Sequence, residues 1–354
     1  MLRVSFYSYK GGAGRSTTSW NTIERLVNLM KPTAKEPFVI VDTDTESAGS
    51  TFLYKADGVF YKNKDYASVQ KRMTDSEDVD YDEADDSDKE TFFKGMYPIG
   101  TFFGLPEAEE KSVLLIGANL HKNSAKDAKV SGDEEDRVED GIQMENFHRN
   151  ITLACRRCGA KALFFDSPSG TQFLARKSIW ESEIIVCCMR PTSQFRVGTR
   201  GQLINFIRTD LEKNKAGKRK YILTPTTVCT DDGQVFVLNG IRNVYPEEAK
   251  KIIEREFGTE EMRENEEIKQ AFKDNVILDM LGPTPVAVAK EIYPESEDKE
   301  SVFGIPEIKR FKWFEACLGK LDELSDNDKM GVNRYEFLAR TILKHSRDGQ
   351  KGEE

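Results

Sequence analysis

Residues suited to holding phosphate lie close together near the start of the chain, in the string KGGAGRST at 10–17. Gly11, Gly12 and Gly14 allow backbone N–H groups to approach one ligand closely, because glycine has no Cβ to obstruct them. A helix that begins directly after the glycines adds the partial positive charge of its amino terminus. The string is therefore expected to bind phosphate oxygens mainly through backbone amides, with its two cations adding charge.

The pattern of apolar residues places this string between a strand and a helix. Leu2, Val4 and Phe6 alternate as in a β-strand, and apolar residues recur at helical spacing from 15 to 30. A strand that feeds a helix through a glycine-rich turn is the arrangement in which many α/β proteins bind phosphate.

Aspartates follow two further predicted strands. The apolar run 38–41 is followed by Asp42 and Asp44, and the run 162–165 is followed directly by Asp166. In α/β proteins the carboxyl ends of parallel strands meet at the edge of the sheet that binds ligands. Asp166 is expected there as a ligand of Mg²⁺, which takes oxygen donors. The alternative for Asp42 and Asp44 is that they only end a strand in a solvated turn.

Three stretches resemble the ParA/MinD family of ATPases. KGGAGRST resembles the family's deviant Walker A motif, K-G-G-x-G-K-[ST]-[ST], with Lys10 at its additional lysine. VIVDTDTESAGST resembles the segment that follows the family's second strand. ALFFDSPSG resembles its Walker B segment, in which Pro168 comes two positions after Asp166. Asn21 falls where the family carries an asparagine in its first helix.

The resemblance spans residues 2–225, and the chain departs from the family pattern within it. Arg15 stands in place of the Walker A lysine, so a planar guanidinium replaces a compact ammonium. Nucleotide binding tolerates this change better than hydrolysis does. Thr45 and Glu46 replace the usual proline and glutamine.

The resemblance implies a doubly wound α/β fold, with a mainly parallel sheet, helices on both faces and the nucleotide at the carboxyl ends of the strands. ATP and Mg²⁺ are the implied ligands. Asp44 would orient the attacking water and Lys10 would reach the nucleotide of a second subunit, so both are candidate catalytic residues. Ser16, Asp42 and Asp166 would organise Mg²⁺. The residues implied to bind the nucleotide are Lys10, Gly11, Gly12, Ala13, Gly14, Arg15, Ser16 and Thr17.

The implied function is an ATPase that forms a homodimer with ATP and regulates a partner protein or a larger complex. If Arg15 permits binding but not hydrolysis, the chain would instead be a nucleotide-binding structural or interaction module. An ATPase that partitions DNA or positions a membrane-bound structure is a further alternative. A tyrosine kinase on a related fold is less favoured, because Tyr335 is the sole tyrosine in the last 40 residues.

Composition and charge limit the class of protein. The chain has 354 residues, 38% of them hydrophobic, and a formal net charge of −9. The segment 76–90 holds nine carboxylates and one lysine, a local charge of −8, which leaves the rest near −1. This near balance neither favours nor opposes a nucleic-acid partner. No apolar run approaches the roughly 20 residues of a membrane span, and the start has no secretory pattern, so a cytoplasmic location is expected.

The expected domain organisation is an ATPase domain over 1–325, followed by a helix and polar tail at 326–354. An acidic insertion is expected at 54–111, because its central run is too charged and too poor in apolar residues to fold alone. In the last helix, Tyr335, Leu338 and Ile342 lie on one face. This face is expected to pack on the core rather than on a membrane.

Further helices, a further strand and a partner contact are expected in the remaining sequence. A helix is expected from about 141 to 158, after an acidic run, and another is expected to begin at Pro306. A strand at 221–223 should end at Thr224 and Pro225, and the segment 190–193 is a candidate partner contact.

The cysteines are expected to be reduced and structural. Cys155 and Cys158 form a C-x-x-C, but there is no second pair at zinc spacing and no histidine cluster. A zinc or Fe–S site at this pair is the alternative.

Overall fold

The structure is a computed structural model. It describes residues 1–45, 49–54, 66, 68–69, 72, 92–118, 134–171, 173–190, 195, 198–199, 201–203, 205–206, 209, 219–229, 235–236, 305–306, 308, 317–321 and 323–351. The acidic run at 76–90 and most of 226–316 lie outside these residues. The chain divides into two compact units, one of residues 1–7 and 26–182 and the other of 8–25 and 183–354.

The first unit is built on a mainly parallel sheet. Its strands are β1 (Leu2–Tyr7), β2 (Phe38–Asp42), β3 (Tyr97–Pro98), β4 (Val113–Ile116) and β5 (Ala162–Asp166). They lie in the order β3-β4-β2-β5-β1, and β3 alone of these five is antiparallel to its neighbour. The residues of β2, β4 and β5 are buried on both faces, as in parallel sheets covered by helices. The predicted strands are confirmed, and so is the doubly wound α/β fold class with a mainly parallel sheet.

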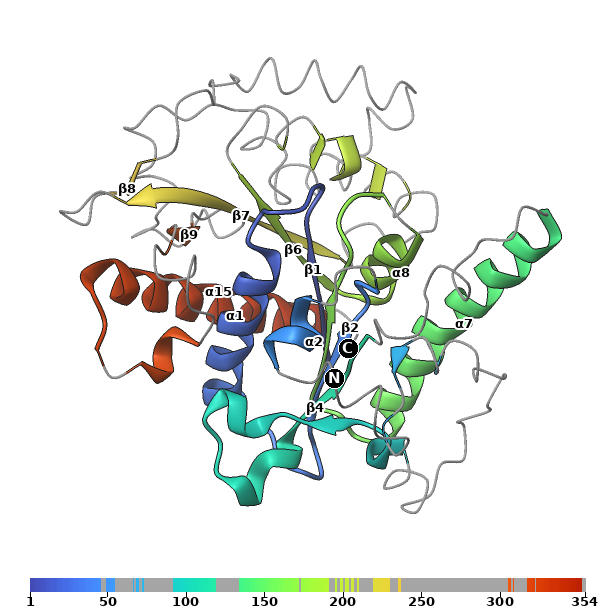
Figure 1. Ribbon diagram of the computed structural model, residues 1–354, viewed down its shortest axis with the longest axis horizontal. Coiled ribbons are helices and arrows are strands. Elements are labelled where there is room, and N and C mark those ends of the chain that lie inside the picture. The colour runs from blue at the N-terminus through green and yellow to red at the C-terminus, as the bar shows by residue number, and fades with distance from the viewer. Residues whose placement is uncertain are drawn as a thin grey trace. The chain divides into compact units, whose positions relative to one another are not determined.

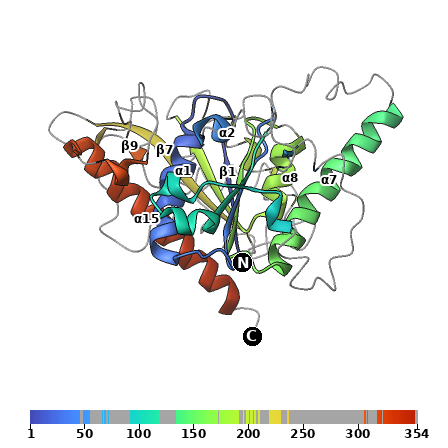
Figure 2. The same cartoon turned by 60° about the horizontal axis from the view of Figure 1, so that its bottom comes forward.

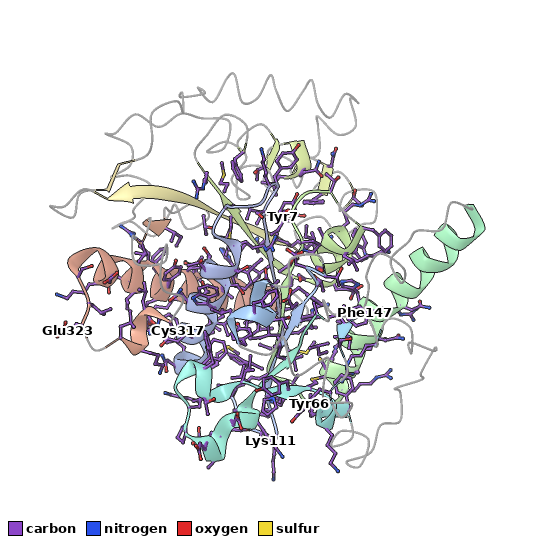
Figure 3. All side chains as sticks on the ribbon, in the orientation of Figure 1. Tyr7, Tyr66, Lys111, Phe147, Cys317 and Glu323 are labelled. Atoms are coloured by element: carbon purple, nitrogen blue, oxygen red, sulfur yellow. The ribbon has the colours of Figure 1, made fainter. Side chains whose placement is uncertain are left out.

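Two helices, α7 (Glu134–Arg157) and α8 (Phe173–Glu181), lie side by side in this unit (Figures 1 and 2). Phe147, Ile151 and Cys155 of α7 pack with residues of the sheet in one buried cluster, and Figure 3 labels Phe147. The helix begins at Glu134, earlier than expected. The helix therefore includes most of the acidic run that was expected to precede it.

Part of the predicted insertion at 54–111 belongs to the packed structure. The short helix α2 (Gly49–Leu53) leads to Tyr54, whose ring contacts that of Phe102 edge-on at a centroid distance of 4.7 Å. Phe102 lies in the 3₁₀ helix η2 (Gly100–Phe103), which is followed by η3 (Glu107–Ser112). A Cβ at Gly100 would lie 2.6 Å from the Glu110 carbonyl oxygen, so this close approach of η2 and η3 requires glycine.

In the second unit, β6 (Ile184–Met189) pairs in parallel with β7 (Lys220–Cys229). β7 also pairs with β8 (Val235–Phe236), which is antiparallel to it, and with β9 (Ile305–Pro306), which is parallel. Two predictions about proline are therefore wrong. Pro225 lies inside β7 and does not end it, and Pro306 lies in β9 and does not begin a helix. Proline is tolerated where a strand position donates no hydrogen bond, as at the edge or the end of a pairing.

The C-terminal helix α15 (Asp326–Lys351) packs on β6 and β9 of the same unit. Tyr335, Leu338 and Ile342 are buried, so the predicted docking of this face on the core is confirmed. Ser325 and Asp328 close the helix start reciprocally: Ser325 N–H donates to Asp328 Oδ2 at 3.1 Å, and Asp328 N–H donates to Ser325 Oγ at 3.2 Å. Of the helices in the described residues, none is long and apolar enough to cross a membrane.

Candidate functional site

Residues 8–14, here called the glycine loop, join the end of β1 to the start of α1 (Arg15–Met30). Gly12 and Gly14 both have φ of +77°, a left-handed conformation that favours glycine. A Cβ placed on Gly11 or Gly12 would meet no atom within 4 Å, so the space beside these two residues is open. The loop therefore has the exposed, glycine-dependent backbone that the sequence predicts for a phosphate site.

The helix after the glycine loop begins as predicted. Thr18 N–H donates to the Gly14 carbonyl at 2.9 Å, which starts the helical hydrogen bonds. Lys10 is exposed, whereas Arg15 is buried, with 9% of its surface accessible. The predicted phosphate-binding residues 10–17 thus form one continuous segment that ends in the first turn of a helix, where the macrodipole favours an anion.

A third cation contacts the glycine loop, and sequence reasoning did not assign it to this site. Arg190 follows β6 directly, and its Nε donates to the Gly12 carbonyl oxygen at 2.7 Å. The sequence offered one signal, an arginine at the carboxyl end of a buried strand, but the signal was interpreted as a partner contact.

Two aspartates from neighbouring strands meet at the carboxyl edge of the sheet. The register pairs Asp42 with Asp166, and both side chains are fully buried. Burial, and next the negative charge of Asp166, raise the pKa of Asp42 to about 7. Asp44 is 7% exposed, and its N–H donates to Asp42 Oδ1 at 3.2 Å. The structure thus brings the predicted metal-binding carboxylates together and does not place Asp42 in a solvated turn.

Hydroxyl groups of α2 hold this carboxylate pair, and sequence reasoning missed them. Ser50 Oγ donates to Asp166 Oδ2 at 2.5 Å. Thr51 donates to Asp42 Oδ2 twice, from its N–H and from its Oγ1, each at 2.7 Å. Thr51 Oγ1 also accepts a hydrogen bond from Ala118 N–H at 2.9 Å. The only sequence signal is the Ser50–Thr51 pair a few residues after the aspartates, at the end of the segment VIVDTDTESAGST.

The carboxyl end of β1 is joined to the segment that follows Asp166. Phe6 is the register partner of Asp166, and the Phe6 carbonyl accepts a hydrogen bond from Ser167 N–H at 3.1 Å. Ser5 Oγ and Ser167 Oγ are 2.7 Å apart, and Tyr7 Oη donates to the Gly170 carbonyl at 3.0 Å. The end of β1 therefore lies at the edge of the sheet where Asp166 lies, and the chain continues from there into the glycine loop.

A row of buried polar side chains contacts the backbone of Asp166. Thr43 Oγ1 donates to the Asp166 carbonyl at 3.0 Å and lies 3.1 Å from Ser178 Oγ of α8. Ser178 Oγ in turn lies 3.2 Å from His148 Nε2 of α7, and all these side chains are buried. This row of hydrogen-bonded side chains fixes the backbone of β5 at Asp166, the residue that carries the carboxylate. His148 and Ser178 were not singled out in the sequence, because nothing in their spacing brings them together.

Asn21, which the family resemblance singled out, makes structural contacts. Its Nδ2 donates to the Thr17 carbonyl at 2.9 Å, and its Oδ1 accepts from Leu318 N–H at 2.9 Å. It thereby ties η6 (Leu318–Lys320) to α1, and Cys317, at the start of this contact, is labelled in Figure 3. Asn21 is 1% exposed. Its role in the structure is to join α1 to the C-terminal part of the second unit.

We expect Asn21→Ala to lower the free energy of unfolding by about 1–3 kcal/mol, because the buried Leu318 N–H loses its acceptor. Urea denaturation followed by circular dichroism measures this loss. Asn205→Ala, at an exposed position, is the matched control and should change stability by less than about 0.5 kcal/mol. Equal losses in the two variants would contradict a special role for the Asn21 contact.

Neither cysteine of the C-x-x-C forms a disulfide, and both are buried. Burial raises the pKa of the Cys155 thiol, so its thiolate is disfavoured. Among the described residues, no group of three or more histidines, cysteines or acidic residues is arranged to hold a metal ion by itself.

No model of a known family matches the chain, and no curated protein matches it. Solved structures of similar fold include the cell division ATPase MinD of Pyrococcus furiosus, with 14% identity, 97% of this chain and 99% of that chain covered, and a TM-score of 0.48. McdA of Cyanothece in complex with ATP has 11% identity, coverage of 98% and 96%, and a TM-score of 0.49. Cobyrinic acid a,c-diamide synthase of Mycobacterium smegmatis, with a bound ATP analogue and magnesium, has 14% identity, coverage of 99% and 97%, and a TM-score of 0.49. At these identities the function of the chain has to be inferred from its own residues.

Proposed function

We propose that the chain binds ATP with Mg²⁺ and hydrolyses it, and that ATP binding favours a homodimer that regulates a partner protein or complex. One observation carries the proposal. The register pairs Phe6 with Asp166. Two residues after Phe6 the glycine loop begins, and its backbone conformation and the helix that follows it suit the binding of phosphate. A triphosphate with its cation needs these two kinds of group at one edge of a sheet.

The donor chemistry fits Mg²⁺. The cation takes carboxylate and hydroxyl oxygens and keeps several waters, and in this proposal Ser16, Asp42 and Asp166 hold it. Asp42 and Asp166 repel each other when both are ionised, as the raised pKa of Asp42 indicates, and a divalent cation offsets this repulsion. Mg²⁺, when bound, neutralises charge on the phosphate oxygens.

The residues of the chain have distinct roles in the proposed reaction. Residues 11–17 bind the phosphates through backbone N–H groups and the helix start, and Arg15 adds a permanent positive charge. Asp44, which is nearly buried, accepts a hydrogen bond from the attacking water and orients it. Lys10 is exposed and contacts the nucleotide of the second subunit. Ser50 and Thr51 keep the carboxylates in place through the bonds they donate.

A second candidate is a nucleotide-binding module without hydrolysis, and the burial of Arg15 favours it. A buried, planar guanidinium has less freedom than a lysine ammonium to follow charge that develops on a transferring phosphoryl group. Partition of DNA and positioning at a membrane are less favoured uses of the same nucleotide site.

ATP turnover of the wild type, Arg15→Lys and Asp44→Ala separates these functions. Binding of a fluorescent ATP analogue with and without Mg²⁺ is measured in parallel, and size-exclusion chromatography with ATP reports dimer formation. The ATPase proposal expects Mg²⁺-dependent turnover that Asp44→Ala removes while binding persists. Binding without turnover in the wild type, with turnover gained in Arg15→Lys, would support the non-hydrolysing module. Absence of nucleotide binding in the wild type would overturn both.

A further inference from the structure

Arg190 contacts the glycine loop from outside that loop. It is exposed at the end of β6, and its Nε donates to the Gly12 carbonyl oxygen at 2.7 Å. Both residues belong to the second unit. Gly12 is one of the two loop glycines with positive φ, and the space where its Cβ would be is open. The arginine therefore meets the loop at the residue whose surroundings leave room for a ligand.

The contact with Gly12 uses only part of the guanidinium. An arginine carries five N–H donors in a rigid planar fork, and Nε supplies one of them. The two Nη atoms carry the other four, and such a fork binds phosphate oxygens in a bidentate manner. Fixing Nε on a backbone carbonyl also restricts the side chain beforehand, so that less conformational entropy is lost when a ligand binds.

The surroundings of Arg190 favour an anion. The glycine loop carries Lys10, and Arg15 begins α1 directly after it, at the positive end of the helix dipole. Three positively charged side chains and the positive end of a helix dipole therefore lie at or beside this loop, which suits a ligand with several negative charges.

We propose that Arg190 is a further phosphate-binding residue of this site, which contacts the β- or γ-phosphate of the bound nucleotide through its Nη groups. The inference rests on the proposed function, because it takes the ligand to be a nucleoside polyphosphate. It goes beyond that function by assigning a third cation, outside the glycine loop, that discriminates among nucleotides by their number of phosphates. The competing role is a positioning one, in which Arg190 only braces the Gly12 carbonyl.

The test compares equilibrium binding of ATP, ADP and AMP, measured by isothermal titration calorimetry with Mg²⁺, in the wild type, Arg190→Ala and Arg190→Lys. We expect Arg190→Ala to weaken ATP binding by about 10- to 100-fold, because a charge-assisted hydrogen bond to phosphate is lost. ADP should lose no more than ATP, and AMP should change by less than about twofold. Arg190→Lys keeps the charge without the fork and should lie between wild type and Arg190→Ala for ATP.

Arg156→Ala is the matched control. Arg156 is exposed near the end of α7, shortly before β5 begins, and so lies toward the edge of the sheet opposite Asp166. This variant should leave all three affinities unchanged. The salt dependence of ATP binding should also be weaker in Arg190→Ala than in the wild type and in Arg156→Ala, because one cation fewer meets the phosphates.

Each other outcome overturns the inference in a recognisable way. An equal loss for ATP, ADP and AMP in Arg190→Ala, accompanied by a lower melting temperature, would assign the residue a bracing role only. Unchanged affinities would exclude any contact with the phosphates. If the wild type binds none of the three nucleotides, the proposed function itself fails, and that result differs from a failure confined to the Arg190 variants.

Discussion

Replacing Asp166 by asparagine is expected to weaken Mg²⁺-dependent ATP binding by at least about 100-fold and to abolish turnover. In the proposed site the carboxylate binds the cation, and loss of even a supporting group around a metal costs about 10- to 100-fold. Stability should respond differently. Without Mg²⁺ the free energy of unfolding is expected to stay the same or to rise, because the variant removes one of two buried charges that repel each other. The amide oxygen still accepts the hydrogen bond from Ser50 Oγ.

Titration with ATP at fixed Mg²⁺, and urea denaturation in EDTA, measure the two effects. Asp328→Asn is the matched control, since Asp328 is also a buried carboxylate but caps α15. That variant is expected to lose about 0.5–2 kcal/mol of stability and to bind ATP as the wild type does. If Asp166→Asn binds Mg²⁺ and ATP normally, Asp166 is not a metal ligand.

The largest expected effect on stability belongs to Phe165→Ala, with a loss of about 3–5 kcal/mol in the free energy of unfolding. Phe165 is fully buried in β5, where it packs with Val39 and Val41 of β2 and with Phe147 of α7. Its ring also faces that of His148 at a centroid distance of 5.6 Å. Alanine would leave a cavity between the sheet and α7, and the rigid strands on either side of β5 limit how far that cavity can collapse.

Urea denaturation of Phe165→Ala and Phe52→Ala gives a matched comparison. Phe52 of α2 is 48% exposed, so its removal should change stability by no more than about 0.5 kcal/mol. Similar losses of unfolding free energy in the two variants would contradict the burial of Phe165 in the apolar cluster between the sheet and α7.

The sequence predicts most of the strands, because parallel strands buried on both faces appear as short, unbroken apolar runs. The runs that contain Val39, Leu114 and Phe164 all lie in strands of the central sheet. The phosphate-loop geometry was also predictable, since Gly12 and Gly14 adopt the positive φ that explains their presence. The meeting of Asp42 and Asp166 followed from the rule that parallel strands end at a common edge.

The residues that sequence reasoning missed act through contacts between distant parts of the chain. In the sequence nothing distinguishes Ser50 and Thr51 from other polar residues, and only the fold brings them into contact with the carboxylates. Arg190 reaches Gly12 only because β6 ends near the glycine loop. Pro225 and Pro306 misled the prediction for a related reason, since whether a strand tolerates proline depends on its neighbours in the sheet.

The bond between Asn21 and Leu318 has a consequence for biosynthesis, because it joins residues 297 positions apart. On the ribosome, Asn21 of α1 cannot form this bond until residue 318 has been synthesised. Contacts of such large sequence separation slow folding, since a long loop has to close before they form. The contact between α1 and η6 is therefore expected to form late in folding.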